Sequence, residues 1–321
     1  MKFAKNKTTI SQVAQVLSQH NNIALFAHTR PDGDTVGATV ALRLALQKLG
    51  KNVQIFCDGE FSDKLLKFPH TAELATEFFG KWDLMVAVDC GDLQRLGNFA
   101  GFYNQHSNTM TVDHHGGEYY SKHNCVLNYA STCQMVWEVL EALGVELDST
   151  IATYLYMGLC TDTGNFANSN TNEQSFLMAA KMCQLGADIQ KVNRVFFKET
   201  TYMHTKLYGK IMSRVRRFYD GKLCIVYITQ QDLQEFGLDH TASEGIVRFA
   251  FDIDTAIVGV SLCEWKPNSF KCSMRGKDFN VRQICQEFGG GGHEVASGCL
   301  INGFLEDVIE KIERVVGYTL C

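Results

Sequence analysis

Three adjacent residues, Asp113, His114 and His115, form a compact group of potential ligands in this sequence. They follow the apolar segment Met110–Val112, which is typical of a buried strand. Successive side chains of a strand point to opposite faces, so both histidines can serve one site only if the strand has ended. We expect the strand to end at Asp113, with one histidine as a metal ligand and the other facing a substrate. A merely polar loop is the alternative.

The segment His28–Asp34 is a second candidate. It places Asp32 and Asp34 four and six residues after a histidine, on the loop that follows a buried strand. One imidazole and two carboxylates suit Mn²⁺, Zn²⁺ or Fe²⁺ better than Ca²⁺. The alternative is a turn that leads into a helix, with Asp34 or Thr35 as the helix N-cap.

Two further aspartates end apolar segments. Asp89 comes directly after Leu84–Val88, and a carboxylate at that position needs a partner because burial of an unpaired charge is costly. Asp162 lies among small residues in the segment 157–166. Taken singly, each aspartate could instead cap a helix or a turn.

Together these segments supply two histidines and four aspartates, all predicted on one rim of one sheet. That set could hold two divalent ions with one bridging carboxylate, an arrangement that generates hydroxide at neutral pH and stabilises a phosphoryl group during displacement. The predicted ligands are His28, Asp32, Asp34, Asp89, His114 and Asp162.

The elements that must position these residues alternate between short apolar strands and helices. We expect four strands, at 23–27, 53–56, 84–88 and 110–112, and helices at 11–17, 34–50, 133–143, 150–159, 173–185 and 189–197. This alternation predicts an α/β domain with a doubly wound, mainly parallel sheet. Ligands of such sheets gather at the carboxyl ends of the strands, where His28, Asp89 and Asp113 are expected.

The character of the chain changes from about residue 210. Strand-like segments at 223–228, 255–263 and 270–274 precede a helix at 281–288, a glycine run, another strand and a final helix at 305–316. At 321 residues, two domains are a better expectation than one. We therefore expect a first domain at 1–186, a linker helix at 187–209, and a smaller α+β domain with a mixed sheet at 210–321.

The second domain has its own candidate residues. Glycines 289–292 would let backbone N–H groups approach an anionic or planar ligand, and His293 could donate to a phosphate, although a flexible hinge is the alternative. Arg248 and Arg275 are candidates for bidentate phosphate contacts, although each taken singly is more typical of a surface arginine. Arg275 is the stronger candidate because it ends an apolar strand.

Composition restricts the function classes. The net charge of −5 argues against a protein that coats long duplex nucleic acid, but it permits a nucleotide in a local pocket. No window approaches the ~20 apolar residues of a membrane span, and the segment 1–12 does not resemble a signal peptide, so we expect a cytoplasmic protein. The twelve cysteines form no CxxC pair and most lie in apolar segments, where free thiols behave as small hydrophobic groups.

The motifs resemble those of the DHH phosphoesterase superfamily. The resemblance rests on His28-x-x-x-Asp32-x-Asp34, Asp89, Asp113-His114-His115 and Thr161–Gly164, in that order. The segment Gly289–His293, with Ser273-x-Arg275 ahead of it, resembles the DHH-associated substrate-binding domain. The two-domain length is most similar to the oligoribonuclease (nanoRNase) and 3′-phosphoadenosine 5′-phosphate phosphatase subfamily.

This resemblance implies two divalent cations, with Mn²⁺ preferred and Mg²⁺ or Co²⁺ as alternatives. One ion would be held by His28, Asp32 and Asp89, and the other by Asp34, Asp89, His114 and Asp162. His115 would face the scissile phosphate as a proton donor or charge stabiliser, and Asp113 would orient a ligand histidine. The residues expected to grip the substrate from across an interdomain cleft are Arg248, Ser273, Arg275, Gly290, Gly291, Gly292 and His293.

The resemblance therefore implies an enzyme that hydrolyses short oligoribonucleotides or linear dinucleotides to mononucleotides, and also 3′-phosphoadenosine 5′-phosphate to AMP. Its partners would be these small substrates, without long duplex nucleic acid or a membrane, and a homodimer is compatible with the sequence. The enzymatic alternatives are a cyclic dinucleotide phosphodiesterase and an inorganic pyrophosphatase. A non-catalytic nucleotide-binding regulator is the alternative from another class.

Overall fold

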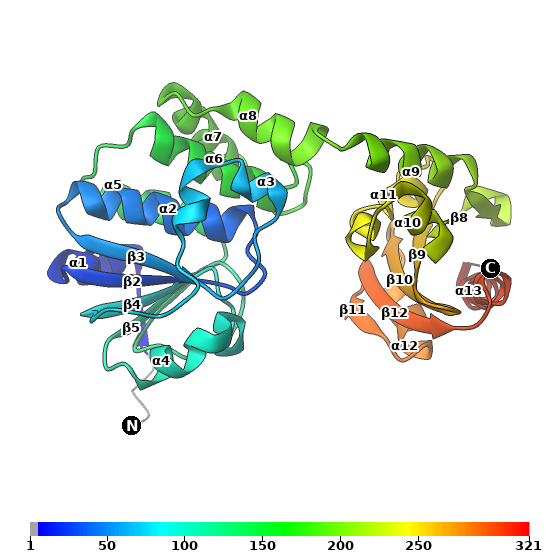
Figure 1. Ribbon diagram of the computed structural model, residues 1–321, viewed down its shortest axis with the longest axis horizontal. Coiled ribbons are helices and arrows are strands. Elements are labelled where there is room, and N and C mark those ends of the chain that lie inside the picture. The colour runs from blue at the N-terminus through cyan, green and yellow to red at the C-terminus, as the bar shows by residue number, and fades with distance from the viewer. Residues whose placement is uncertain (1–5, 118, 321) are drawn as a thin grey trace. The chain divides into compact units, whose positions relative to one another are not determined.

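The computed structural model describes residues 6–117 and 119–320, and the chain divides into two compact units, 1–199 and 200–321 (Figure 1). The division falls inside the segment 187–209 that we expected to form one linker helix. Helix α8 (Ile189–Asn193) and the π-helical turn Arg194–Lys198 belong to the first unit, whereas α9 (Tyr202–Ser213) begins the second.

The first unit is built on a six-stranded sheet in which all strands are parallel. The order is β1-β6-β5-β4-β2-β3, with β1 at Asn6–Lys7, β2 at Asn22–Ala27, β3 at Asn52–Cys57, β4 at Leu84–Val88, β5 at Thr109–Asp113 and β6 at His123–Val126. The chain runs from β2 outward to β3 and then returns to the other side of β2 with β4. The neighbours β2 and β4 therefore mark the topological switch point, where ligands of doubly wound sheets bind. The predicted doubly wound sheet is confirmed.

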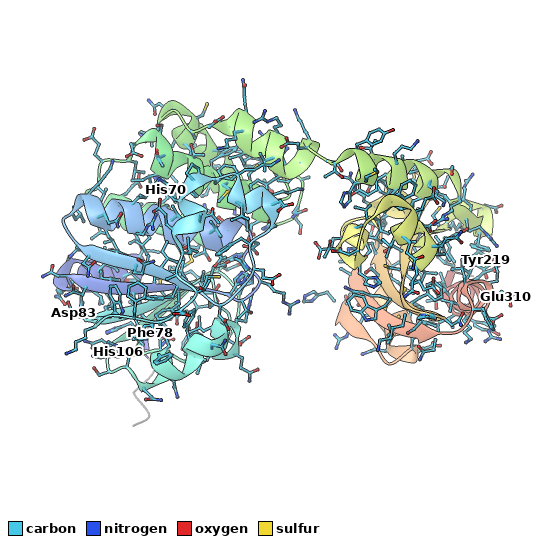
Figure 2. All side chains as sticks on the ribbon, viewed as in Figure 1. His70, Phe78, Asp83, His106, Tyr219 and Glu310 are labelled. Carbon is cyan, nitrogen blue, oxygen red and sulfur yellow. The ribbon has the colours of Figure 1, made fainter. Side chains whose placement is uncertain are left out.

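Helices cover both faces of this sheet (Figure 1). One face packs against α1 (Ile10–Gln19), α2 (Gly33–Lys48), α5 (Thr132–Ala142) and α6 (Ser149–Asp162), and α7 (Glu173–Gln184) lies against α6. The other face carries an aromatic cluster that includes Phe26, Phe78 and Tyr103 and is completed by the 3₁₀ segment Leu93–Phe99 and α4 (Ala100–Gln105). Figure 2 labels Phe78 of this cluster. Adjacent residues such as Leu25 and Phe26 thus enter different cores, which explains the unbroken apolar run in the sequence.

Several elements differ from their predicted extents. Helix α2 begins at Gly33, and its N-cap is Asp32 rather than Asp34 or Thr35. Strand β5 begins at Thr109, one residue before the predicted apolar segment, and ends at Asp113 as expected. The short strand β6, together with α4 and the small helices α3 (Asp63–Leu66) and Pro69–Glu73, was not predicted. A four-residue strand that starts with His123 and Asn124 carries no apolar run to reveal it.

The second unit contains a mixed six-stranded sheet, as predicted. Its order is β11-β12-β10-β9-β8-β7, and only the β8–β9 pair is parallel. The strands are β7 (Arg216–Phe218), β8 (Leu223–Ile228), β9 (Val258–Lys266), β10 (Ser269–Gly276), β11 (Gly291–His293) and β12 (Ala296–Asn302). Helices α9, α10 (Gln230–Phe236) and α11 (Arg248–Phe251) pack on one face, and α12 (Val281–Glu287) and α13 (Leu305–Leu320) on the other.

The thiols and the hydropathy of the helices agree with the sequence interpretation. Every cysteine that the structure describes is free, and all of them except Cys183 are buried. Among the described helices, none combines the length and hydrophobicity that a membrane span requires. Of the N-terminal segment 1–12, residues 1–5 lie outside the described part of the chain.

Candidate metal centre

The switch point of the parallel sheet carries the first potential ligands. His28 follows β2, Asp89 follows β4, and Asp113 ends β5 immediately before His114. Asp89 has a φ of 61°, in the left-handed region that non-glycine residues rarely adopt. Such strain persists where the surroundings enforce it and is concentrated at functional sites.

One group of ligands consists of His28, Asp32 and Asp89, whose ligand atoms lie within 4.8 Å of one another. His28 Nε2 is 3.7 Å from Asp32 Oδ2 and 3.7 Å from Asp89 Oδ2. The other oxygen of Asp32, Oδ1, accepts hydrogen bonds from the backbone N–H groups of Asp34 and Thr35 at 3.1 and 3.0 Å. Asp32 therefore caps α2 with one oxygen and faces the histidine with the other, so the segment starts a helix as the alternative expected, but with Asp32 as the N-cap in place of Asp34 or Thr35.

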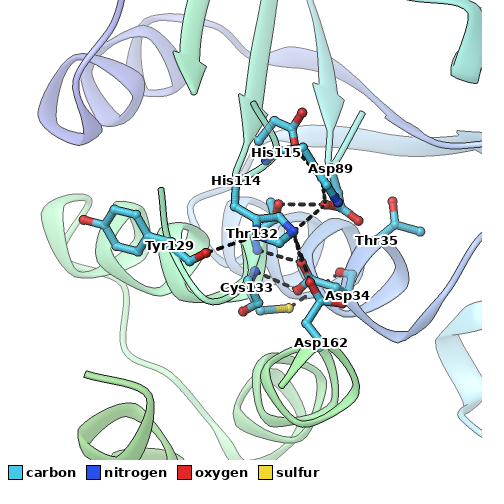
Figure 3. Close-up of polar contacts among 12 residues, drawn as sticks. Asp34, Thr35, Asp89, His114, His115, Tyr129, Thr132, Cys133 and Asp162 are labelled. Atoms are coloured by element: carbon cyan, nitrogen blue, oxygen red, sulfur yellow. Dashed lines mark hydrogen bonds and ion pairs between the residues drawn. The ribbon is translucent and has the colours of Figure 1, made fainter. Parts of the chain in front are cut away.

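A second group consists of Asp34, His114 and Asp162 (Figure 3). His114 Nε2 lies 3.9 Å from Asp34 Oδ2 and 3.0 Å from Asp162 Oδ2. The opposite ring nitrogen, Nδ1, is 3.2 Å from the carbonyl oxygen of Tyr129 and donates to it. This bond turns Nε2 toward the carboxylates, as the outer hydrogen bond of a metal-ligating histidine does.

Asp89 joins the two groups because its two carboxylate oxygens face different histidines. Oδ2 lies 3.7 Å from His28 Nε2, whereas Oδ1 lies 3.7 Å from His114 Nε2. One carboxylate thus serves both ligand groups, which is the arrangement of a bridging ligand in a two-metal site.

Close packing of α2 against α6 brings Asp34 and Asp162 together. A Cβ added at Gly158 of α6 would lie 2.5 Å from Asp34 Oδ1 and closer still to Cys133 Sγ, and one added at Gly33 would overlap Thr161. Only glycine permits this approach. The two helices therefore deliver their aspartates to one point although 128 residues separate them along the chain, from position 34 to position 162.

The electrostatics of this cluster suit the binding of cations. Burial, followed by the neighbouring charge of Asp89, raises the pKa of Asp34 well above its ordinary value, and burial also raises the pKa of Asp89. Within the described part of the chain, neither ring nitrogen of the buried His28 has a hydrogen-bond partner. Unpaired buried imidazole nitrogens and crowded carboxylates are costly, and divalent ions between them would satisfy both. The residues present therefore fit a two-metal group.

His115 lies beside this cluster but is bonded differently. Its Nδ1 donates to Asp113 Oδ1 at 2.9 Å and lies 3.4 Å from Asp89 Oδ1. The hydrogen bond to Asp113 has the largest effect on the pKa of His115, and the contact with Asp89 adds to it. Together they raise this pKa to about 10. Asp113 was expected to orient a ligand histidine, and the structure places its hydrogen bonds on His115 instead of His114. His115 also forms a geometrically possible ligand group with Asp89 and His114.

Two residues of the site escaped prediction. The backbone N–H groups of Thr132 and Cys133 donate to Asp34 at 2.6 and 2.9 Å, and the Thr132 hydroxyl donates to Asp89 Oδ1 at 2.9 Å (Figure 3). Ser131 caps the same helix through its side chain. A Ser–Thr pair before an apolar helix signals a helix start, but nothing in the sequence shows that this start meets Asp34.

Of the predicted substrate residues of the second unit, Ser273, Arg275, Gly291 and His293 share one face of its sheet. Arg275 of β10 pairs with Ala296 of β12, which pairs with His293 of β11. The neighbouring row contains Ser273, Gly298 and Gly291. Directly paired residues of antiparallel strands point to the same face, so Arg275, Ser273 and His293 lie on one surface, with strands ~4.8 Å apart.

The second half of the glycine run, Gly291 and Gly292, belongs to the edge strand β11 rather than to a hinge. A Cβ at Gly290 would overlap the backbone of Gly298. A Cβ at Gly292, which has a φ of 140°, would likewise overlap Ala296 and Ser297. Gly291, in contrast, has open space around it. The run therefore brings β11 close to β12 and leaves Gly291 and His293 exposed.

Arg248 lies apart from the strand residues, at the start of α11. It is exposed, and its guanidinium lies 5.1 Å from the ring centroid of Phe249. The last residue of α11, Phe251, packs on Gly259, the partner of Arg275 on β9. The helix that carries Arg248 thus contacts the same face of the sheet as Arg275.

Residues 22–159, which include β2 to β6 and most of the ligand cluster, match the family description "DHH family, N-terminal domain". This segment of the chain is therefore a DHH-family N-terminal domain. The matched segment ends shortly before Asp162, so this last ligand is placed by the structure and not by the family match.

Known proteins resemble the whole chain. A Thermus thermophilus protein named "Bifunctional oligoribonuclease and PAP phosphatase NrnA" is 29% identical over 322 aligned residues, covering 95% of this chain and 91% of that protein. The Bacillus subtilis protein of the same name is 25% identical and covers 97% and 98%. Among solved structures, an exopolyphosphatase-related protein from Bacteroides fragilis shares the fold with a TM-score of 0.85 at 21% identity, covering 96% and 95% of the two chains.

Proposed function

We propose that this protein is a two-metal phosphoesterase that hydrolyses short oligoribonucleotides or linear dinucleotides to mononucleotides, and 3′-phosphoadenosine 5′-phosphate to AMP. The observation that carries the proposal is a pair of neighbouring ligand groups at the switch point of the sheet, with Asp89 Oδ2 facing His28 of one group and Asp89 Oδ1 facing His114 of the other. The names of relatives that align over nearly their whole length support the substrate class.

The first ion would be held by His28, Asp32 and Asp89, and the second by Asp34, His114 and Asp162 with Asp89 shared. A pair of divalent ions, when bound, lowers the pKa of water and neutralises charge on a phosphoryl group. Imidazole and carboxylate ligands suit Mn²⁺, with Mg²⁺ or Co²⁺ as alternatives. Tyr129 orients the His114 ring, and the α2 cap orients Asp32.

His115 is proposed to act on the substrate rather than on the ions. Its Nδ1 is occupied by Asp113, and its side chain is 43% exposed, so Nε2 is available to a phosphate oxygen. From this position the ring can stabilise the phosphoryl charge and donate a proton to the leaving oxygen, which is the work of a general acid.

The second unit is proposed to bind the terminal phosphate or the base of the substrate. Near the β11 edge its sheet offers a half-buried guanidinium at Arg275, a half-buried hydroxyl at Ser273 and an exposed imidazole at His293, with glycines between them that let a flat ligand approach the backbone. We assign Arg248 to the same task. A platform of this kind suits a nucleotide better than pyrophosphate, which needs more lysines and arginines.

The test is turnover by the Mn²⁺-loaded full-length protein. An RNA dimer, 3′-phosphoadenosine 5′-phosphate, cyclic di-AMP and pyrophosphate are compared side by side, with the same protein in excess chelator as the blank. We expect the first two to be hydrolysed fastest. Faster hydrolysis of cyclic di-AMP or pyrophosphate would favour those alternatives, and binding of nucleotides without turnover would favour the regulator. The expected cytoplasmic location and homodimer stay predictions.

A further inference from the structure

We infer that Thr132 is a positioning residue that holds Asp89 in its bridging orientation. The inference rests on the proposed two-metal site and goes beyond its ligands, because Thr132 contacts a ligand and would touch neither ion nor substrate. Its side chain is fully buried at the first residue of α5, and its hydroxyl donates to Asp89 Oδ1 at 2.9 Å.

Asp89 needs such a constraint because its carboxylate has two competing partners. Oδ1 must face His114 Nε2, at 3.7 Å, if it is to serve the second ion. His115 Nδ1 lies nearer, at 3.4 Å, and would draw the same oxygen toward itself. The Thr132 hydroxyl donates a hydrogen bond to Oδ1 and so holds this oxygen in place. With Oδ1 held, Oδ2 stays turned toward His28.

The backbone conformation of Asp89 does not by itself fix the orientation of the carboxylate. Asp89 leaves β4 in the left-handed conformation, and its own N–H donates to the carbonyl of Val112. That bond fixes the main chain but leaves the side chain free to rotate about its Cα–Cβ and Cβ–Cγ bonds. A donor from another element is therefore required to select one orientation of the carboxylate.

The same helix start also fixes the neighbouring ligand. The N–H groups of Thr132 and Cys133 each donate to one oxygen of Asp34, at 2.6 and 2.9 Å. Ser131 caps α5 by accepting from the N–H of Gln134, which holds these donors in place. One rigid helix end thus sets the positions of both Asp34 and Asp89, and among the described residues the Thr132 hydroxyl makes the only side-chain hydrogen bond from the helix start to Asp89.

The competing explanation is that Thr132 is simply a well-packed residue at a helix start. Two substitutions separate the two explanations. Thr132→Val keeps the shape and removes the hydroxyl, whereas Thr132→Ser keeps the hydroxyl and removes the methyl group. Thr39→Val is the matched control, because Thr39 is equally buried on α2 and its hydroxyl donates only to backbone carbonyls.

The experiment measures Mn²⁺ binding to full-length protein by isothermal titration calorimetry and records the electron paramagnetic resonance spectrum of the loaded protein. The wild type should bind two ions with a spin-coupled spectrum. Thr132→Val should weaken the second ion about 10- to 100-fold, as loss of a residue that supports a metal ligand typically does, and replace the coupled spectrum with that of isolated Mn²⁺. Thr132→Ser should restore both, and Thr39→Val should change neither.

Two outcomes would overturn the inference. A Thr132→Val protein with unchanged affinities and a coupled spectrum would show that the hydroxyl does not position Asp89, while wild-type turnover would leave the proposed function standing. If Thr132→Ser weakens Mn²⁺ binding as Thr132→Val does, the hydroxyl alone does not position Asp89, and packing of the methyl group contributes to ion binding. Should the valine variant fail to fold, Thr132→Ala provides the same test, because it removes the hydroxyl without placing a methyl group beside the Asp89 carboxylate. A wild type that binds fewer than two ions would refute the metal site itself.

Discussion

Asp113 binds His115 through two hydrogen bonds to the same oxygen. Asp113 Oδ1 accepts from the backbone N–H of His115 at 3.0 Å and from its Nδ1 at 2.9 Å. Asp113 is buried at the end of β5, so the ring is fastened to the rigid sheet although it stands on a loop. An imidazole held in this way keeps one orientation, with Nε2 directed away from Asp113.

The first prediction follows from this pair. His115→Ala should retain both ions and lose most activity, by roughly 10²–10⁴ in kcat, because it removes the proposed proton donor but no proposed ligand. Metal content by inductively coupled plasma analysis and kcat on an RNA dimer are measured together. Loss of an ion would show instead that His115 is a ligand, as its group with Asp89 and His114 allows geometrically.

Asp89 and Asp162 should differ in how many ions their loss removes. Asp89→Ala should abolish binding of both ions because its oxygens face both ligand groups, whereas Asp162→Ala should affect only the second. Mn²⁺ stoichiometry by calorimetry distinguishes the two variants, and Asp92→Ala, an exposed helix cap, is the control that should keep both ions. Equal stoichiometry for Asp89→Ala and Asp162→Ala would argue against a bridge.

Gly158 should tolerate no side chain. The new Cβ of Gly158→Ala would overlap Cys133 Sγ and crowd Asp34, so α6 must move away from α2 and take Asp162 with it. We expect a loss of about 1–3 kcal/mol in the free energy of unfolding and weaker binding of the second ion. Urea unfolding and Mn²⁺ titration test this. Gly209→Ala, in a helix with open space, should be neutral or stabilising.

The sequence was sufficient to predict the parallel sheet and the placement of ligands at strand ends. Both depend on local patterns: apolar runs of strand length, and polar residues that terminate them, such as His28 after β2 and Asp89 after β4. Their convergence followed from a general rule of parallel sheets rather than from any detail of this chain.

The contacts between ligands could not be predicted in the same way. The bonds from α5 to Asp34 join residues 98 and 99 positions apart and depend on how closely α2 and α5 pack. The partner of Asp113 depends on the path of the loop after β5. The glycine run was compatible with a hinge or a ligand cradle, and only its pairing with β12 shows an ordered edge strand.

Arg275 should contribute to substrate binding without affecting the ions. Arg275→Ala should raise KM for an RNA dimer about 10- to 100-fold, since a hydrogen bond to a charged group is worth roughly 1.5–3 kcal/mol, and should leave Mn²⁺ stoichiometry unchanged. Arg282→Ala is the control, because this exposed arginine lies on α12, which packs on the opposite face of the sheet. An unchanged KM for Arg275→Ala would remove it from the proposed platform.

A buried ion pair in the second unit makes stability depend on pH. Asp232 accepts hydrogen bonds from Arg214, one of them at 3.2 Å, and lies 2.9 Å from Lys210 Nζ. Burial alone would raise the pKa of Asp232, but the bonds from Arg214 and Lys210 outweigh it and lower this pKa well below the ordinary value. The folded state therefore binds a proton at Asp232 less readily than the unfolded chain does.

This pair should stabilise the protein above the pKa of about 3.9 that Asp has in an unfolded chain, and its contribution should disappear as the pH falls from there toward the lower folded pKa. Asp232→Asn should cost about 1–3 kcal/mol at pH 7, because it leaves Arg214 with a neutral partner, and the cost should shrink in increasingly acid solution. Urea unfolding followed by circular dichroism between pH 7 and pH 3 measures both proteins. Glu235→Gln, which removes an exposed partner of Lys210, should change stability by less than about 1 kcal/mol at every pH. A difference between wild type and Asp232→Asn that grew in acid would contradict the pairing.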